Sequence, residues 1–359
     1  MQSMVLFRAD ASVQLGIGHV MRCLAIAQAW QDTGGQAAFV CHGHMPALRA
    51  RLHSEGMEVF QLVSEPGSVD DAIETAKIAS STNAEWLCVD GYHFGSRYLQ
   101  QLRSPDTWLA LIDDYGERER YGMELVVNPN IFGQREMYQG RLVSGELLTG
   151  LDYALLRREF RSRRAREVVA PALATKLLIT VGGSDPDNLT LQLLSCINDV
   201  DIDDLEVTIV SGGASPHHEA LRAAAQDARH RVRLLVDVRD MPGILSGAEA
   251  VISAAGGTCA ELALLGIPMV LVTIAENHAR NAEEYAAHDL AVSLGWCAKL
   301  DPGAVSASIE SFLRDPALRR RIAQNALTRI DGTGAVRVAQ AMKRIASAKL
   351  QPMALRNAP

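Results

Sequence analysis

Short apolar runs alternate with helix-like segments along most of the chain. In the first part the apolar runs lie at residues 4–7, 37–40, 58–60, 86–90, 109–113 and 125–127. In the second part they lie at residues 177–181, 207–210, 232–236, 250–253 and 269–272. Strands that alternate with helices usually pair in parallel, and the helices cover the sheet. The pattern therefore predicts two consecutive α/β halves, closed by helices near residues 315–330 and 334–350.

The alternation is interrupted between the two halves. Residues 145–174 differ in composition from the alternating segments, with six arginines between positions 157 and 166. Such a run suits either a phosphate or nucleic-acid patch or a solvated linker, and the acidic balance of the chain favours the linker. We expect a first domain at 1–155, a linker at 156–174, a second domain at 175–350 and a flexible tail at 351–359.

Composition narrows the class of protein. The 359-residue chain has a formal net charge of −7 and a pI of about 5.8, which argues against a broad nucleic-acid or acidic-membrane surface. The six cysteines are scattered without a C-x-x-C pair, as is typical of a reducing compartment. No signal peptide precedes the first run, and no apolar stretch approaches the ~20 residues of a membrane helix. We expect a cytoplasmic protein with no nucleic-acid partner and no membrane insertion.

A glycine loop follows the first apolar run. Gly16 and Gly18 precede a segment whose apolar residues recur at helical spacing, so His19 is predicted at a helix N-terminus. Unpaired N–H groups at such a turn favour an anion, and His19 is the candidate for chemistry there. A dinucleotide-binding loop is disfavoured because Met21 stands where a third glycine belongs. No glycine loop contains the lysine of a P-loop, and no G-x-S-x-G elbow is present.

Acidic residues follow several of the predicted strands. Asp10, Asp90 and Asp113 each stand at or next to the end of an apolar run, and parallel strands bring such ends to one edge of a sheet. We expect a pocket at this edge, beside the glycine loop. The three carboxylates would suit a hard cation if they converge, but nothing in the sequence requires a metal, and no zinc-site spacing is present.

Glycine turns recur in the second half. Gly182 and Gly183 follow one run, and the stretch 256–261 places two glycines and a threonine before Glu261. One interpretation is a capping box, in which Thr258 is the N-cap and Glu261 its partner. The other is a phosphate site at a helix N-terminus, where Glu261 accepts hydrogen bonds from a ribose diol.

Taken in order, these motifs resemble one enzyme family, the UDP-sugar hydrolases of pseudaminic acid biosynthesis. The resemblance spans residues 4–285 and rests on the stretches 8–12, 16–23, 89–92, 112–114, 153–160, 182–185 and 255–258. It implies an α/β fold similar to that of the GT-B glycosyltransferases, with two Rossmann-like domains facing a central cleft. The second domain would hold most of the nucleotide.

The resemblance also implies an activity. UDP-2,4-diacetamido-2,4,6-trideoxy-β-L-altropyranose would be hydrolysed to the free sugar and UDP by water attack at the anomeric carbon, with no cofactor and no metal. His19 would position or deprotonate the water. The implied substrate-binding residues are Asp10, Gly16, Gly18, Arg22, Tyr92, Asn277 and His278. The implied nucleotide-binding residues are Gly183, Val238, Met241, Gly256, Gly257, Thr258 and Glu261. The UDP-sugar would be the partner, and a monomer is compatible with this chemistry.

One position departs from the family pattern, because His278 stands where the family usually has Gln. Two alternatives to hydrolysis also stay open. In a GT-B glycosyltransferase, His19 would deprotonate an acceptor hydroxyl instead of water. A catalytically silent module would bind the nucleotide sugar without turning it over.

Overall fold

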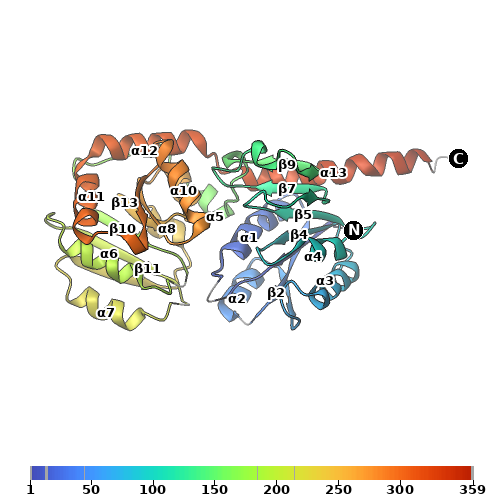
Figure 1. Ribbon diagram of the computed structural model, residues 1–359, viewed down its shortest axis with the longest axis horizontal. Helices are drawn as coiled ribbons and strands as arrows, with labels where there is room; N and C mark the ends of the chain where they lie inside the picture. Colours follow the sequence, from blue (N-terminus) through green and yellow to red (C-terminus); the bar gives the residue numbers. More distant parts are fainter. Residues whose placement is uncertain (1, 13–14, 44, 184, 214, 357–359) are drawn as a thin grey trace. The chain divides into compact units, whose positions relative to one another are not determined.

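The computed structural model describes residues 2–12, 15–43, 45–183, 185–213 and 215–356, apart from the side chains of Asn277 and of residues 349–356. The chain divides into two compact units. Unit 1 comprises Met1–Arg158 and Thr333–Pro359, and unit 2 comprises Glu159–Gly332. Each unit contains a parallel sheet with helices packed against it (Figure 1). Within the described part of the chain, no helix has the length and apolar character needed to cross a bilayer.

Unit 1 is built on a seven-stranded sheet with the order β3-β2-β1-β4-β5-β7-β9. All of its neighbouring strands pair in parallel. The strands are β1 (Met4–Ala9), β2 (Gln36–His42), β3 (Glu58–Leu62), β4 (Trp86–Asp90), β5 (Trp108–Ile112), β7 (Leu125–Asn128) and β9 (Glu146–Thr149). A separate two-stranded ladder consists of β6 (Arg120–Tyr121) and β8 (Leu142–Val143).

Helices cover both faces of this sheet. They are α1 (Gly18–Gln31), α2 (Pro46–Ser54), α3 (Val69–Ser81), α4 (Ser96–Gln101) and α13 (Gly334–Arg356), with short 3-10 turns η1 (Arg135–Tyr138) and η2 (Leu151–Tyr153). Apolar residues of α1, α2 and α13 share one buried cluster, and those of α3 and α4 share another. The alternation along β1 explains the division, because Val5 and Phe7 belong to the first cluster and Leu6 to the second.

Unit 2 repeats this plan with a six-stranded parallel sheet in the order β12-β11-β10-β13-β14-β15. Its strands are β10 (Lys176–Thr180), β11 (Glu206–Ser211), β12 (Arg231–Val236), β13 (Ala250–Ala254), β14 (Met269–Thr273) and β15 (Val292–Trp296). Its helices are α5 (Arg158–Arg161, beginning one residue before the unit boundary), α6 (Leu189–Asn198), α7 (His218–Gln226), α8 (Met241–Leu245), α9 (Thr258–Leu264), α10 (Glu276–Ala287), η3 (Cys297–Lys299), α11 (Pro302–Arg314) and α12 (Pro316–Arg329).

The C-terminal segment departs from the expected division of the chain. Residues 333–350 were expected in the second domain, but α13 belongs to unit 1, where Val338 and Met342 are fully or almost fully buried in the cluster beneath α1. The expected tail at 351–359 is helical as far as Arg356. The reason is packing: the apolar residues of α13 complete a face of the first sheet, which the local sequence pattern does not reveal. The expected linker likewise contains the short helix α5.

A buried arginine anchors the other face of the first sheet. Arg8, in β1, is fully buried, donates to Asp71 through Nε (3.0 Å) and Nη2 (2.7 Å), and contacts Asp10 through Nη1. Its guanidinium also lies 4.7 Å from the ring centre of Phe94. The alternation that directs Leu6 toward α3 and α4 directs Arg8 to the same side. One cation therefore joins β1, α3 and the loop after β4.

Removing this cation should destabilise unit 1 strongly. Arg8→Leu leaves two carboxylates buried without their counter-charge, and such losses cost about 3–5 kcal/mol. Urea denaturation followed by circular dichroism measures the change in the free energy of unfolding. Arg344→Leu is the matched control, because the side chain of Arg344 is 63% exposed where it pairs with Glu146, and exposed pairs contribute about 0–1 kcal/mol. Equal effects of the two substitutions would contradict the assigned role of Arg8.

Candidate functional site

The polar residues of unit 1 gather where the strand order reverses. Strand β1 has β2 on one side and β4 on the other. The chain runs from β1 through β2 to β3 toward one edge of the sheet, and from β4 onward it runs toward the other edge. Ligands of doubly wound sheets bind beyond the carboxyl ends of the strands at such a point. Ala9 pairs with Asp90 at the ends of β1 and β4. This pairing brings the loop after β1 close to the last residue of β4.

The glycine loop ends at a helix, as predicted. Gly16 has a φ of +69°, a conformation that favours glycine, and its N–H donates to the carbonyl of Ser12 (2.8 Å). Helix α1 begins at Gly18, and the N-cap residue Ile17 provides no side-chain cap. A Cβ added at Gly18 would meet none of the described atoms within 4 Å. Packing within unit 1 therefore does not require glycine at this position.

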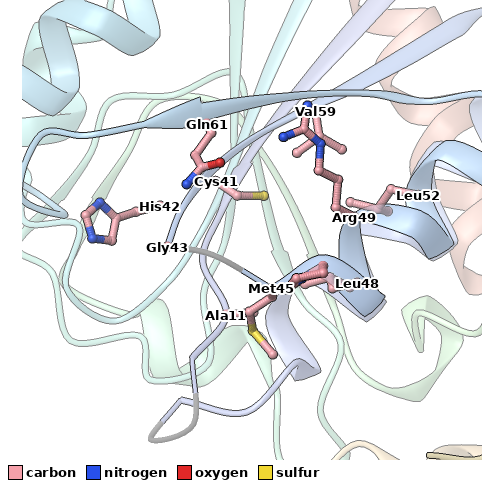
Figure 2. Close-up of a pocket in the computed structure, with 11 residues that line it drawn as sticks. Ala11, Cys41, His42, Gly43, Met45, Leu48, Arg49, Leu52, Val59 and Gln61 are labelled. Atoms are coloured by element: carbon pink, nitrogen blue, oxygen red, sulfur yellow. The ribbon is translucent and has the colours of Figure 1, made fainter.

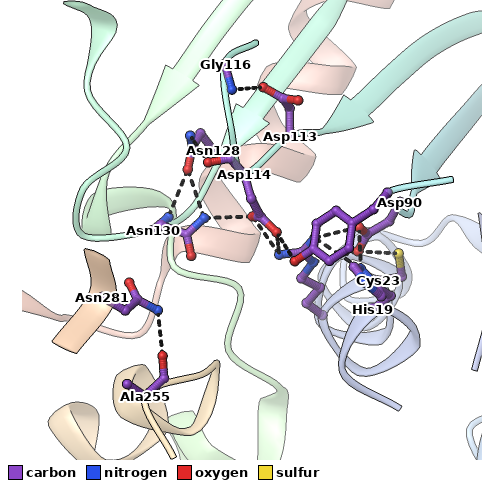
Figure 3. A network of polar contacts seen from close by, with 12 residues as sticks. His19, Cys23, Asp90, Asp113, Asp114, Gly116, Asn128, Asn130, Ala255 and Asn281 are labelled. Carbon is purple, nitrogen blue, oxygen red and sulfur yellow. Dashed lines mark hydrogen bonds and ion pairs between the residues drawn. The ribbon is translucent and has the colours of Figure 1, made fainter. Parts of the chain in front are cut away.

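His19, the second residue of α1, forms a pair with Asp90. The two side chains are joined by a hydrogen bond between Nδ1 and Oδ1 (2.8 Å), as Figure 3 shows. His19 is 8% exposed and Asp90 is fully buried. A carboxylate can only accept, so this bond requires the proton of His19 on Nδ1, and in that tautomer Nε2 keeps a lone pair; Nδ1 also lies 3.2 Å from Nη2 of Arg22. This arrangement orients a histidine as a general base.

Arg22, one turn further along α1, bridges two carboxylates. It donates to Asp90 through Nε and Nη2 (both 2.6 Å) and to Asp114 through Nη1 (2.8 and 3.0 Å). Burial raises the pKa of Asp90, but the charges and hydrogen bonds of Arg22 and His19 together outweigh burial and hold this pKa well below its usual value. Asp90 is therefore a carboxylate at neutral pH. The thiol of Cys23, whose pKa burial raises, lies 3.8 Å from Oδ2 of Asp90.

Tyr92 stands beside the histidine ring. Its hydroxyl donates to Oδ2 of Asp114 (2.8 Å), and its ring meets that of His19 edge to face, with 4.7 Å between the centroids. Burial, followed by the charge of Asp114, raises the pKa of Tyr92, so the phenol keeps its proton. The residue is nevertheless 45% exposed. Tyr92 therefore has both a fixed hydroxyl and surface available to a substrate.

Asp10 lies in the network of Arg8. It accepts from His93 Nε2 (2.9 Å) and from the backbone N–H of His42 (2.6 Å), in addition to Arg8. Burial raises its pKa, but the hydrogen bonds from His93 and Arg8 outweigh burial and lower it to about 2. The structure thus places this predicted substrate-binding residue among protein donors from β1, the end of β2 and the loop after β4.

Asp10, Asp90 and Asp113 do not converge, which was the condition for a cation site at this edge. Each carboxylate faces its own protein donors, and Asp113 accepts from the N–H of Gly116 and the hydroxyls of Tyr121 and Tyr138. Among the described residues, no group of three or more histidine, cysteine or acidic side chains is arranged to hold a metal ion. The strand ends meet at one edge, as expected, but the acids there are paired with donors.

A small cavity lies between α2 and the ends of β2 and β3 (Figure 2). Its volume is about 30 Å³, which is enough for a water molecule but not for a sugar. Its lining is mostly apolar and consists of Ala11, Cys41, His42, Gly43, Met45, Pro46, Leu48, Arg49, Leu52, Val59 and Gln61. We therefore place the candidate site at His19 instead.

The glycine turns of unit 2 also lie where its strand order reverses, after β10 and β13. Gly183 is close to Gly212 in the loop after β11, since a Cβ added at Gly212 would lie 2.1 Å from the carbonyl oxygen of Gly183. Asp185 caps α6 by accepting from the N–H groups of Leu189 (2.8 Å) and Thr190 (3.0 Å). Ser184, between them, lies outside the described residues.

The second turn differs in one detail from its prediction. Helix α9 begins at Thr258, and its N-cap residue is Gly257, which provides no side-chain cap. The expected capping box with Thr258 as N-cap is therefore wrong, because the backbone of Gly257 enters the helical region one residue earlier. Glu261 lies in the first turn of α9. Gly256 lies beside His278, since a Cβ added at Gly256 would lie 3.2 Å from Nε2 of His278.

The other predicted residues of unit 2 are near turns as well. Val238 lies between β12 and α8, and Met241 begins α8. Burial lowers the pKa of His278, whose buried Nδ1 has no hydrogen-bond partner among the described atoms. Asn281 donates to the carbonyl of Ala255 (3.1 Å), and its buried Oδ1 is likewise unpartnered. The side chain of Asn277 lies outside the described residues.

The arginine run is held by acidic side chains and carbonyl groups. Arg158 pairs with Asp32 (2.7 Å) in unit 1, and Arg163 pairs with Asp240 (3.0 Å) in unit 2. Arg164 donates to the carbonyl of Leu327 (2.8 Å). These contacts favour the linker interpretation over a phosphate patch.

The chain is similar in sequence to a glycosyltransferase domain family and to two proteins of known name. Residues 176–331, most of unit 2, match the glycosyltransferase family 28 C-terminal domain. The spore coat polysaccharide biosynthesis protein SpsG of Bacillus subtilis is 24% identical over 335 residues, which cover 92% of this chain and 95% of SpsG. The UDP-2,4-diacetamido-2,4,6-trideoxy-beta-L-altropyranose hydrolase of Campylobacter jejuni is 25% identical over 265 residues, covering 73% of this chain and 88% of the hydrolase.

A solved structure extends the likeness to the whole chain. The spinosyn rhamnosyltransferase SpnG complexed with thymidine diphosphate aligns with a TM-score of 0.64 at 17% identity, covering 94% of this chain and 100% of SpnG. The chain therefore has the GT-B fold, with two Rossmann-like domains, which confirms the predicted fold class. Its second domain is of the glycosyltransferase family 28 C-terminal type.

Sequence reasoning missed one part of the site. It considered Asp90 only as one of three carboxylates that would suit a cation, it assigned Asp114 no role, and it did not consider Asn130, whose Nδ2 donates to Oδ1 of Asp114 (2.7 Å). The sequence contains one feature that predicts these carboxylates: Arg22 follows His19 by three residues, so the two side chains share one face of the helix. A buried guanidinium on that face requires a nearby carboxylate.

The lowered pKa of Asp10 predicts how stability depends on pH. A carboxyl group whose folded pKa is about 2, against 3.8 ordinarily, stabilises the fold above pH ~4 and loses that contribution as the pH falls toward 2. We expect the free energy of unfolding of wild type to fall by about 2 kcal/mol more than that of Asp10→Asn across this interval. Urea titrations at several pH values test this, and parallel pH dependences of the two proteins would contradict it.

Proposed function

We propose that this protein hydrolyses a UDP-sugar to the free sugar and UDP. The pair formed by His19 and Asp90 is the observation that carries the proposal. It combines a histidine whose Nε2 is left as a base with a buried carboxylate that favours the imidazolium formed when the base takes a proton. It lies at the point of the first sheet where ligands of this fold class bind.

The proposed reaction is a displacement at the anomeric carbon. His19 takes a proton from water while the water oxygen forms a bond to that carbon. The bond between the anomeric carbon and the UDP oxygen breaks, and UDP leaves with the electron pair. UDP is a stable anion, so its departure requires no acid. The base need only orient and activate water, and Asp90 holds His19 in the required tautomer.

Unit 2 is the proposed nucleotide-binding unit. Its match to the glycosyltransferase family 28 C-terminal domain supports this assignment, and the SpnG structure, which has the same fold, is complexed with thymidine diphosphate. The glycine turns at Gly183 and at Gly256 and Gly257 allow close approach of a phosphate. We assign the ribose diol to Glu261 and the base to the segment between Val238 and Met241, with Thr258 at the phosphate.

For the sugar we propose the substrate named for the Campylobacter relative, UDP-2,4-diacetamido-2,4,6-trideoxy-β-L-altropyranose. Tyr92, Asn277 and His278 would contact it, with Gly16 and Gly18 leaving room at the helix N-terminus. The structure leads us to reassign Asp10 and Arg22. Both form hydrogen bonds to other protein side chains, so we propose that they position the residues that line the site and do not contact the sugar.

Glycosyl transfer is the second candidate. The family 28 match and the likeness to a rhamnosyltransferase favour it, because both belong to proteins named for transfer. His19 would then take its proton from an acceptor hydroxyl, with the same bond to UDP breaking. The chemistry at His19 is otherwise unchanged, so the two functions differ only in which molecule supplies the attacking oxygen.

UDP release without an acceptor distinguishes the two functions. We expect sustained multiple turnover when the pure protein meets a panel of UDP-linked diacetamido-trideoxy sugars alone. His19→Ala is the control, and it should lower kcat by about 10²–10⁴-fold while leaving the inhibition constant of UDP nearly unchanged. Release only after an acceptor is added would replace hydrolysis with transfer. An active His19→Ala protein would remove His19 from the chemistry.

Glu261→Ala should weaken nucleotide binding instead of chemistry. Loss of a charge-assisted hydrogen bond of about 1.5–3 kcal/mol corresponds to a Kd for UDP raised about 10–100-fold, as measured by calorimetry. Glu283→Ala, on an exposed position of the same unit, is the matched control and should leave the Kd unchanged. If both variants bound UDP like wild type, the ribose assignment would be wrong.

A further inference from the structure

Asp114 is a buried carboxylate to which the proposed reaction assigns no role. It lies two residues beyond β5 and is 5% exposed. Its oxygens accept from Nη1 of Arg22 (2.8 and 3.0 Å), the hydroxyl of Tyr92 (2.8 Å) and Nδ2 of Asn130 (2.7 Å), as Figure 3 shows in part. None of these donors is His19. Any influence of Asp114 on the reaction must therefore act through its neighbours.

The fold holds Asp114 firmly in place. The neighbouring Asp113 accepts from the N–H of Gly116 (2.9 Å) and from the hydroxyls of Tyr121 (3.0 Å) and Tyr138 (2.9 Å). These bonds fix the loop that follows β5. Several buried groups thus serve to aim one carboxylate at α1, as a preorganised site requires.

Charge explains what a second carboxylate accomplishes. With Asp90 alone, Arg22 would form a neutral pair, and the attraction of Asp90 for a protonated His19 would be offset by the guanidinium. With Asp114 on the other side of Arg22, the cluster of one cation and two carboxylates carries one net negative charge beside the ring. Burial raises the pKa of Asp114, but the charge of Arg22 and the hydrogen bonds from Arg22 and Tyr92 together lower it below its usual value, so this negative charge is present at neutral pH.

We propose that Asp114 is a positioning residue of this site, which offsets the charge of Arg22 so that Asp90 stabilises a protonated His19, and which holds Tyr92 against the His19 ring. The link to catalysis rests on the proposed function, in which His19 takes a proton. The charged and titratable side chains that face His19 are Asp90, Arg22, Tyr92 and, through its contact with Asp90, Cys23. Asp114 determines how two of these four are placed.

The first test measures the protonation of His19 without any substrate. Nitrogen NMR of 15N-histidine-labelled protein, with His19 assigned by its loss in His19→Gln, follows the ring as pH changes. We expect a proton on Nδ1 in wild type. In Asp114→Asn the midpoint should move to lower pH, because one negative charge is lost. In Arg22→Gln/Asp114→Asn it should return toward wild type, because the net charge is restored.

The double variant also protects the test against misfolding. The double variant keeps the net charge of the cluster, and its glutamine amide at position 22 can still donate to Asp90, so it remains informative if Asp114→Asn does not fold. In that case a double-variant midpoint close to wild type supports the proposal, and a midpoint far from wild type overturns it. Asp106→Asn, an exposed acid of the same unit, is the matched control for loss of charge.

The second test measures turnover. We expect Asp114→Asn to lower kcat about 10–100-fold and to move the acid limb of the rate profile to lower pH, with the inhibition constant of UDP unchanged. Tyr92→Phe keeps the charge of Asp114, so it should leave the acid limb in place. An unchanged His19 midpoint in folded Asp114→Asn overturns the proposal. If the His19 midpoint shifts in Asp114→Asn but the wild-type protein releases no UDP from any sugar, the role proposed for Asp114 is supported and the proposed function is refuted.

Discussion

The carboxylate of Asp90 is the group on which the arrangement of unit 1 depends. Its Oδ1 accepts from His19 and from Nη2 of Arg22, and its Oδ2 accepts from Nε of Arg22. A fully buried carboxylate is costly unless donors surround it, and both donor residues come from the first two turns of α1. The strand end, the helix N-terminus and the catalytic candidate are therefore positioned by one another. If one of them is displaced, the other two lose their partner.

Unit 1 uses the same physical device twice. Arg8 lies between Asp10 and Asp71 on the face covered by α3 and α4, and Arg22 lies between Asp90 and Asp114 at the end of the sheet. A guanidinium offers donors in a planar fork, so it can satisfy two carboxylates at once. The first cluster joins elements within the core. The second lies beside His19, the residue to which we assign proton transfer.

Unit 2 has the same strand plan but a different site chemistry. Its turns after β10 and β13 are formed by glycines, and buried polar atoms of His278 and Asn281 lie near the second turn without partners among the described residues. Close backbone approach and unsatisfied polar atoms suit a ligand that supplies its own charge and hydrogen bonds. A phosphate-bearing nucleotide fits this description, whereas the ion-paired site of unit 1 suits proton transfer.

Much of the architecture followed from the sequence alone. Alternating apolar runs identified all the strands of the two sheets except β9 and β15, and the glycine loop correctly placed His19 at the start of a helix. Those features depend on residues near one another in the chain. Only the tertiary structure showed that α13 completes the first unit, that Gly257 and not Thr258 caps α9, and that the three strand-end acids have separate partners. It alone joined His19 to Asp90, and Arg22 to Asp114, because these pairs are separated by 71 and 92 residues and meet only when β1, β4 and β5 lie side by side.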